Sequence, residues 1–299
     1  MREISLDQLR TLVAVADLGR FSAAARALHL AQPTVSLHIS ELECRLGTPL
    51  LIRGGARVTP TAAGNVLLER ARRLLRDAAD ATDCVRRQAE GRAGRVRVGA
   101  PTGVLVHLLP AVLAAMARDY PGVDVDIAIV GSAEAMRRIA DGSLDLGFVA
   151  MPQRPLEEVQ VTHWRTDPMM AFVPAAWSAP KQVTPQWLAG RPLIFNDPST
   201  HMYRQTMEWF AAGACAPRAR MELNYTEAMK SLVAAGYGAA VLPLEDPSLD
   251  HPGMHVLPLK PRLKRDIGLA HRPPADIDGA TQNLLKTLAR FRVATRARA

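Results

Sequence analysis

Several neutral polar side chains gather at the start of one predicted helix, where they could contact the edges of DNA bases. Gln32 is followed by Thr34, Ser36 and His38, with the apolar Leu37 among them. Glutamine can form two hydrogen bonds to adenine, and serine or threonine hydroxyls can donate to or accept from several bases. Taken singly, each of these residues also fits a solvated helix face, so their meaning depends on the elements that position them.

Three short helices are predicted around these residues. A first helix ends before Gly19, and Ser22 can cap a second helix over Ala23–Leu28. Pro33 is tolerated as the first residue of a third helix, which runs until Gly47. Two helices joined by a short turn match the outline of a helix-turn-helix, so the third helix is the one that would enter the major groove.

A short hairpin is predicted directly after these helices. Gly54 and Gly55 fit its turn, and short apolar stretches fit its two arms. Arg53 and Arg57 flank this turn, where their guanidinium groups could hold phosphates. Such a hairpin would form the wing of a winged helix-turn-helix domain.

One long helix is predicted from Thr61 to about Gln88, because this stretch has no proline and a single early glycine. A helix of about 28 residues is about 42 Å long. It cannot bury a heptad seam alone, so we expect it to pair with a second copy of itself. The alternative is a long surface helix packed on its own domain. The seam consists of Leu67, Ala71, Leu74, Ala78, Ala81 and Val85.

After a polar linker at residues 90–95, the pattern changes to strands alternating with helices. Val96 and Val98 belong to a first strand, and residues 123–129 alternate as a second. This alternation predicts a parallel α/β sheet, in one domain or in two lobes. Further strands are expected at Leu144–Ala150, Met169–Pro174, Leu193–Phe195, Met221–Asn224 and Ala239–Leu242, with a closing helix at Ile277–Arg292.

The N-terminal pattern resembles the LysR-type transcriptional regulators, with the motifs of that family in the same order. The strand–helix alternation of the remainder resembles the effector-binding domain of the same family. The motifs are Ala24-Ala25-x-x-Leu28, Gln32-Pro33-x-x-Ser36, Leu42-Glu43-x-x-Leu46-Gly47, Leu50-x-x-Arg53 and Thr61-x-Ala63-Gly64.

The resemblance implies an α/β fold class with three parts. These are an N-terminal winged helix-turn-helix DNA-binding domain at residues 1–60, a dimerisation linker helix at 61–90, and a two-lobed α/β effector-binding domain at 91–299. The last domain resembles the periplasmic binding proteins, with lobe I at about 91–165 and 266–299 and lobe II at about 166–265. The implied partners are double-stranded DNA, a small-molecule effector, and further copies of the chain in a homodimer or homotetramer.

The resemblance also implies an effector site between the lobes, at turns that follow strands. Hydroxyls and free N–H groups at helix starts favour an anion, so a small carboxylate is the effector class we expect. The alternative is that Thr102, Ser132, Thr200 and Thr226 only cap their helices. The matching positions are Pro101, Thr102, Gly103, Ser132, Ser199, Thr200 and Thr226.

Leu37 departs from the family pattern, in which Arg or Lys often follows the serine. Leucine cannot form two hydrogen bonds to guanine, although it could pack on the methyl group of thymine. The resemblance therefore implies how the domain docks on DNA but not the usual base preference. The implied DNA-contacting residues are Ser22, Gln32, Pro33, Thr34, Ser36, Leu37, His38, Arg53 and Arg57.

The formal net charge of +8 is unevenly distributed along the 299 residues, with +5 over residues 1–95, −4 over 96–256 and +7 over 257–299. Basic ends around an acidic middle suit a chain of which one end meets a polyanion. Cys44, Cys84 and Cys215 lie far apart, so neither a disulfide framework nor a zinc site is expected. We expect no cofactor, no metal and no membrane-spanning segment.

Two other function classes remain open from the sequence. The C-terminal part alone would fit a cytoplasmic small-molecule-binding protein without specific gene regulation, and the α/β pattern would also fit an enzyme. No nucleophile–base or metal signature supports catalysis, so we expect no enzyme activity. A redox role for Cys215 lacks a nearby second thiol. No secretory signal is recognised, so a cytoplasmic location is expected. The sequence identifies neither the effector nor the target genes, and it does not distinguish activation from repression.

Overall fold

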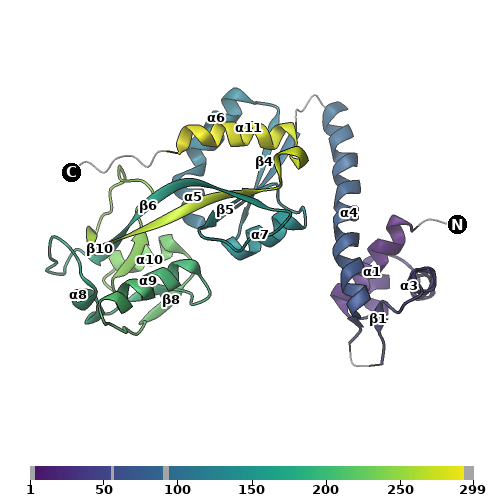
Figure 1. Cartoon of the computed structure of the whole chain (residues 1–299), viewed down its shortest axis with the longest axis horizontal. Helices are drawn as coiled ribbons and strands as arrows, with labels where there is room; N and C mark the ends of the chain where they lie inside the picture. Colours follow the sequence, from purple (N-terminus) through teal and green to yellow (C-terminus); the bar gives the residue numbers. More distant parts are fainter. Residues whose placement is uncertain (1–3, 55–56, 90–93, 293–299) are drawn as a thin grey trace. The chain divides into compact units, whose positions relative to one another are not determined.

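The computed structural model describes residues 4–54, 57–89 and 94–292. The chain divides into two compact units, Met1–Gly91 and Arg92–Ala299 (Figure 1). The first unit contains the short helices and the long helix, and the second contains the strands and helices of the α/β region. The predicted linker at residues 90–95 lies mostly outside the described residues.

Three helices open the N-terminal unit. Helix α1 (Leu6–Leu18) begins with a capping box, in which Ser5 and Gln8 satisfy each other's backbone N–H groups. Helices α2 (Phe21–Ala27) and α3 (Gln32–Leu46) follow after short turns. The predicted helix-turn-helix outline is therefore confirmed.

The predicted cap of the second helix is wrong. Gly19 ends α1 in the left-handed conformation with φ 69°, Arg20 is extended, and α2 begins directly at Phe21. This early start lets the ring of Phe21 pack on the core of the domain. Ser22 consequently lies exposed in the first turn and does not cap the helix.

The core of the N-terminal unit fixes which face of α3 points outward. Val35, Ile39 and Leu42 are fully buried and belong to one cluster with Leu12 and Val15 of α1. After α3, strand β1 (Leu51–Ile52) pairs antiparallel with β2 (Thr59–Pro60), as predicted for the hairpin.

Helix α4 (Ala62–Ala89) begins where the chain returns to this core. The Thr61 hydroxyl donates to the Pro49 carbonyl and accepts from the Gly64 N–H, at 2.8 and 2.9 Å. A Cβ at Gly64 would lie 2.0 Å from the Leu50 carbonyl oxygen, so only glycine allows this close approach.

The predicted seam of α4 divides into two parts. Ala71 is fully buried and Leu67 is partly buried in the core of its own domain, so Ala71 cannot contribute to a contact with a second copy. Farther along, 51% of Leu74 and 73% of Val85 are exposed. The first part of the helix thus follows the alternative of packing on its own domain, because α1 already occupies that face.

The C-terminal unit is built on a six-stranded sheet with the order β4-β3-β5-β10-β6-β9. Its parallel part comprises β3, β4 and β5, and a separate sheet pairs β7 with β8 in parallel. The strands are β3 (Gly94–Ala100), β4 (Val123–Ile129), β5 (Leu146–Ala150), β6 (Gln160–Pro174), β7 (Ile194–Asn196), β8 (Met221–Leu223), β9 (Ala240–Pro243) and β10 (Met254–His271).

The predicted parallel sheet is only part of the observed one, because β6 and β10 form a long antiparallel pair through the middle of the sheet. The strand predicted at Met169–Pro174 is only the end of β6, and β10 was not predicted. Pro258 and Pro261 interrupt the pattern of β10, and the register shifts between Pro258 and Leu263. Figure 1 shows this pair running from the part of the unit with α6 and α11 to the part with α9 and α10.

Helices cover both ends of this pair and enclose separate cores. Val96, Phe148 and Trp164 lie in one core, and Phe195 and Trp209 lie in another. The helices are α5 (Thr102–His107), α6 (Leu109–Asp119), α7 (Ser132–Ala140), α8 (Pro185–Ala189), α9 (His201–Ala212), α10 (Thr226–Ala234), α11 (Gly279–Leu288), and two 3₁₀ turns at Pro274–Asp276 and Ala289–Phe291.

Candidate functional sites

Helix α3 presents most of the predicted DNA-contacting residues on its outer face. Gln32, Pro33 and Leu37 are exposed, and Thr34 and Ser36 are half-buried. The buried residues on the opposite side of the helix determine this orientation. The start of α3 is therefore free to meet a partner surface.

His38 differs from the other predicted residues of α3. Its Nδ1 lies 2.9 Å from the Thr11 hydroxyl oxygen of α1, and its side chain is half-buried. This contact turns His38 toward the domain, so the structure does not place it with the outward residues of the helix.

The two arginines of the predicted wing are exposed and anchored to the helices. Arg53 forms an ion pair with Glu43 of α3 at 2.8 Å and lies over the ring of Phe21. Arg57 donates to the Asp17 carbonyl of α1 at 2.9 Å. The turn at residues 55–56 lies outside the described residues.

In the C-terminal unit, one cavity of about 500 Å³ gathers all of the predicted effector positions. Pro101 and Gly131 follow strands β3 and β4, and other lining residues begin α9 and α10. The carboxyl ends of parallel strands are where open α/β sheets commonly bind ligands. The predicted residues in the lining are Pro101, Thr102, Gly103, Ser132, Ser199, Thr200 and Thr226.

The hydroxyl groups in this cavity differ in the hydrogen bonds that they form. Thr200 caps α9 by accepting from the Tyr203 N–H, as the capping alternative predicted. Ser132 instead accepts from the Ala150 N–H at 2.9 Å. The Thr102 hydroxyl has no hydrogen-bond partner within the described part of the chain. Helices α5, α7 and α10 begin after Pro101, Gly131 and Tyr225, so the capping alternative is wrong for Thr102, Ser132 and Thr226.

Ser199 is turned toward Asp197. Its hydroxyl and its backbone N–H both donate to the Asp197 carboxylate, at 2.6 and 2.8 Å. These two hydrogen bonds from Ser199 lower the pKa of Asp197. The hydrogen of the Ser199 hydroxyl is thus already used in a hydrogen bond within the chain.

The sequence analysis missed several polar residues of the cavity. Buried Asn196 at the end of β7 and buried Arg265 of β10 are the most enclosed of them. Asn196 could have been found as the residue that directly follows a predicted strand, whereas Arg265 lies on a strand that was not predicted. Phe148 and Ile267 add apolar surface. The other missed polar residues are Glu134, Gln153, His201, Arg204 and Asn224.

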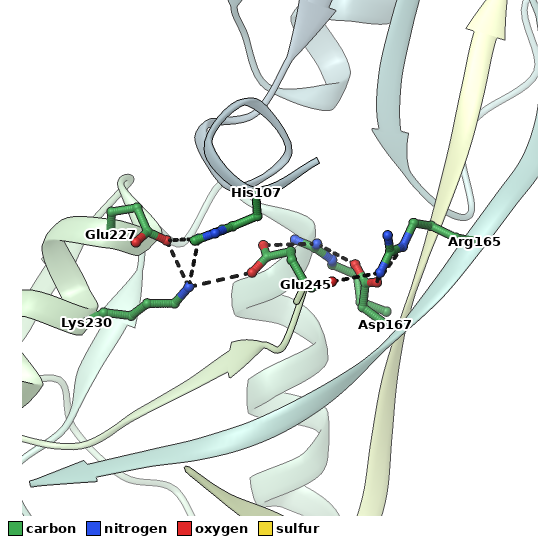
Figure 2. A network of polar contacts seen from close by, with 7 residues as sticks. His107, Arg165, Asp167, Glu227, Lys230 and Glu245 are labelled. Carbon is green, nitrogen blue, oxygen red and sulfur yellow. Dashed lines mark hydrogen bonds and ion pairs between the residues drawn. The ribbon is translucent and has the colours of Figure 1, made fainter. Parts of the chain in front are cut away.

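Arg265 lines the cavity and belongs to a buried network of charges. Figure 2 shows this network around Asp167 and Glu245. It lies directly opposite Asp167 in the β6–β10 register and donates to the Asp167 carboxylate at 2.8 Å. Arg165 donates to the other oxygen of Asp167 at 2.7 Å, and Glu245 accepts from Arg265 at 3.3 Å. The Nε of Arg265 is buried and has no hydrogen-bond partner among the described residues.

The same network reaches two helices that also line the cavity. Lys230 of α10 lies 3.6 Å from Glu245 and forms an ion pair with Glu227 at 2.8 Å. His107, at the end of α5, contacts Glu227 at 2.8 Å and Lys230 at 3.2 Å. Figure 2 shows these side chains converging from α5, α10 and the long strands. Because α5 starts with Thr102 and α10 with Thr226, both helices join the cavity to the network.

Two features show how closely the groups around Glu227 and Glu245 are packed. Desolvation raises the pKa of Glu227, but hydrogen bonds from Lys230 and His107 outweigh it and lower the pKa overall. At Gly103, a Cβ would lie 2.3 Å from the nearer Glu245 carboxylate oxygen. The carboxylate of Glu245 therefore occupies the space that a side chain at residue 103 would need.

Comparison with known proteins identifies both units. The model of the bacterial regulatory helix-turn-helix proteins of the lysR family matches residues 6–65, and the LysR substrate binding domain matches residues 89–292. The chain belongs to the LysR family. It is a DNA-binding transcriptional regulator with an effector-binding domain.

Individual relatives agree with this assignment. The chain is 31% identical to the HTH-type transcriptional regulator YnfL of Escherichia coli (strain K12), over 80% of this chain and 82% of that protein. It is 29% identical to a hydrogen peroxide-inducible genes activator of Pectobacterium carotovorum subsp. carotovorum, over 95% of this chain and 96% of the relative.

Solved structures of the family have the same fold. The crystal structure of CbnR, a LysR family transcriptional regulator, is similar with a TM-score of 0.71 and 22% identity, over 97% of this chain and all of CbnR. A structure of full-length CbnR with its target DNA gives the same TM-score at 23% identity, with the same coverage of both chains. The family resemblance and the fold class predicted from the sequence are thereby confirmed.

Two further observations concern this LysR-family chain. Among the described residues, no group of three or more His, Cys, Asp or Glu side chains could hold a metal ion. None of the helices in the described ranges is both long and apolar enough to cross a membrane.

We predict that acidification destabilises the C-terminal unit through His201. Desolvation, assisted by nearby Arg204, lowers the pKa of His201 below its ordinary value of 6.5. Below pH 6.5 the unfolded chain then binds a proton that the folded chain does not. The free energy of unfolding therefore has its full value above pH 6.5 and decreases as the pH falls through that value. For one proton, the free energy of unfolding should decrease by at most about 1.4 kcal/mol for each pH unit.

The test is chemical denaturation between pH 7 and pH 5.5. In His201→Gln the dependence of the unfolding free energy on pH should be smaller than in the unaltered chain. His251, whose pKa is lowered first by desolvation, supplies the part that remains. Identical slopes in the two proteins would contradict the prediction.

Proposed function

We propose that this LysR-family regulator reads double-stranded DNA with α3 and is switched by a small anionic molecule bound in the cavity of its C-terminal unit. The observation that carries the proposal is the convergence of all seven expected effector positions on one cavity. A volume of about 500 Å³ lies within the usual size of small-molecule sites.

The donors around the cavity favour a carboxylate. The Thr102 hydroxyl and the buried Nε of Arg265 are both unbonded within the described chain. For the buried Nε of Arg265 the missing partner is costly, and a ligand oxygen that accepts from this Nε–H removes the cost. Asn196 and the first N–H groups of α9 add further donors.

The charge network supports a switching role for the ligand. Thr102 and Arg265 belong to different elements, and both elements contribute to the contacts around Glu245 and Lys230. An effector that binds one arrangement of these elements more tightly than another shifts the population toward it. The proposed consequence is a different presentation of two DNA-binding domains in an assembly of copies.

We also propose that the chain catalyses no reaction and acts in the cytoplasm, where its DNA target lies. The serine hydroxyls of the cavity contact Ala150 and Asp197, and neither of them contacts a histidine base. The lining contains no cysteine, so the proposed effector is held without a thiol reaction. A binding protein without gene regulation is the alternative, and DNA binding distinguishes the two.

We predict that the chain selects a specific sequence from a random DNA duplex library and that its affinity falls steeply with salt, because phosphate contacts release counterions. Arg53→Ala should weaken binding to all sequences similarly. Gln32→Ala should mainly relax discrimination at one base pair, by about 1–3 kcal/mol. Titrations at several salt concentrations measure both effects. Failure to enrich any sequence would favour the alternative of a binding protein.

The exposed part of α4 is proposed to form the contact between copies, with Leu74, Ala78, Ala81 and Val85 as its residues. Leu74→Glu should abolish the dimer without lowering the melting temperature, because Leu74 is half exposed. Ala71→Glu should instead unfold the N-terminal unit, because it buries a charge. Asn65→Glu, which helical geometry puts on the opposite side of α4 from Leu74, is the matched control. Unchanged mass of Leu74→Glu in light scattering would contradict the assignment.

The proposed effector site is tested with Thr102→Val and Ser132→Ala, singly and together. Loss of a donor to a buried carboxylate costs roughly 1.5–3 kcal/mol, about ten- to more than a hundredfold in affinity. Thr102→Val should lower affinity without lowering the melting temperature, since its hydroxyl is unbonded in the free cavity. Ser132→Ala should also lose about 1 kcal/mol of stability, because the Ala150 N–H loses its partner.

A thermal-shift screen of small organic acids supplies the ligand, and calorimetry then measures affinity in each variant. The double variant should leave DNA affinity without ligand unchanged, because both residues belong to the C-terminal unit. Unchanged ligand affinity in the double variant would remove Thr102 and Ser132 from the site.

A further inference from the structure

The outer face of α3 carries no cation where a base-reading helix meets DNA. From Gln32 to Cys44 the exposed residues that lack an inward contact are neutral, and the first arginine of the helix is Arg45 in its last turn. Arginine and lysine make the commonest specific contact to guanine, with two acceptors on that base. The start of α3 lacks the side chains that this contact needs.

The acidic side chains and the imidazole of α3 ahead of Arg45 are engaged with the domain itself. Glu41 accepts from Gln8 at 2.6 Å, and His38 lies against Thr11. Glu43 accepts from the Leu50 N–H at 2.9 Å in addition to its ion pair with Arg53. The exposed side chains that remain from Gln32 to Cys44 are therefore an amide, small hydroxyls, the Cys44 thiol and apolar groups.

Leu37 is the largest apolar side chain on this face, and 55% of it is exposed. Pro33 lies one helical turn before it and is also exposed, so the two form a small apolar surface. The C5-methyl group of thymine is the apolar group that base pairs present in the major groove. An apolar surface at the start of a recognition helix fits that methyl group and offers nothing to guanine.

We propose that Leu37, supported by Pro33, reads a thymine methyl group and makes this regulator prefer an A·T pair at that position. The proposal rests on the proposed docking of α3 in the major groove. Gln32 contributes a separate contact, since an amide bonds adenine rather than covering a methyl group. Specificity then arises from burial of a methyl group in place of hydrogen bonds from a cationic side chain to guanine.

The experiment uses the full chain and the duplex it selects from a random library. Each thymine of that duplex is replaced in turn by deoxyuridine, which removes the methyl group and keeps every hydrogen-bonding group. At one thymine per half-site, the unaltered protein should lose affinity about fourfold, the value of one buried methyl group of about 0.8 kcal/mol. In Leu37→Ala that loss should disappear, while losses at other positions stay.

Three controls keep the outcome decisive. Leu46→Ala changes another exposed leucine at the far end of α3 and should keep the uridine effect. Gln32→Ala should also keep it, because its contact is a different one. Leu37→Arg should shift the selected base at that position toward guanine.

The results separate this proposal from the broader function. If the library yields no preferred sequence, the proposed DNA reading by α3 fails first. If a sequence is selected but no uridine substitution matters, or the uridine effect persists in Leu37→Ala, the assignment of Leu37 is overturned while DNA binding stands. Melting curves of each variant confirm that the N-terminal unit is folded.

Discussion

The pairing of Arg265 with Asp167 across two neighbouring strands is the interaction on which the C-terminal unit depends most. It lies where β6 and β10 pass from one core to the other, and Arg165 and Glu245 complete it. Charges buried this deeply destabilise a fold strongly when one partner is missing, because the remaining charge is left uncompensated. Loss of one member of the network would therefore destabilise the strand pair that positions Arg265 and Ile267 in the cavity.

Several of the elements that line the cavity also form the charge network. Arg265 and Ile267 line it from β10, while α5 and α10 each contribute a residue at their start and charged residues farther along. A displacement of α5 relative to α10 must alter the distances among His107, Glu227 and Lys230. Direct contacts thus connect the proposed effector site with the arrangement of these helices, which is the physical requirement for a ligand-dependent change.

The parts that could be predicted from the sequence are those governed by local chemistry. Helical spacing, Pro33 and the glycine stops located α1 and α3, and the family resemblance implied all seven cavity positions, at turns that follow strands. The missed features depend on distant neighbours. Ala71 was placed in an intermolecular seam because its burial by α1 requires the tertiary structure.

β10 was not predicted for a related reason. Prolines and basic residues interrupt its alternating pattern, and its pairing with β6 stabilises it as a strand. The charge network could not be predicted either, because its members come from α5, β6, α10, β10 and the segment after β9. Only the antiparallel register brings them together, and no local spacing encodes that register.

The close approach of Gly103 to Glu245 has a consequence for how this regulator can diversify. Residue 103 lines the cavity, yet any side chain there would displace a buried carboxylate. A lineage that acquires a larger residue at 103 must first or simultaneously change residue 245, and then rebalance Arg265 and Lys230. In the proposed effector site, ligand preference is therefore easier to alter at Thr102 or Ser132, whereas a change at residue 103 requires compensating changes across the fold.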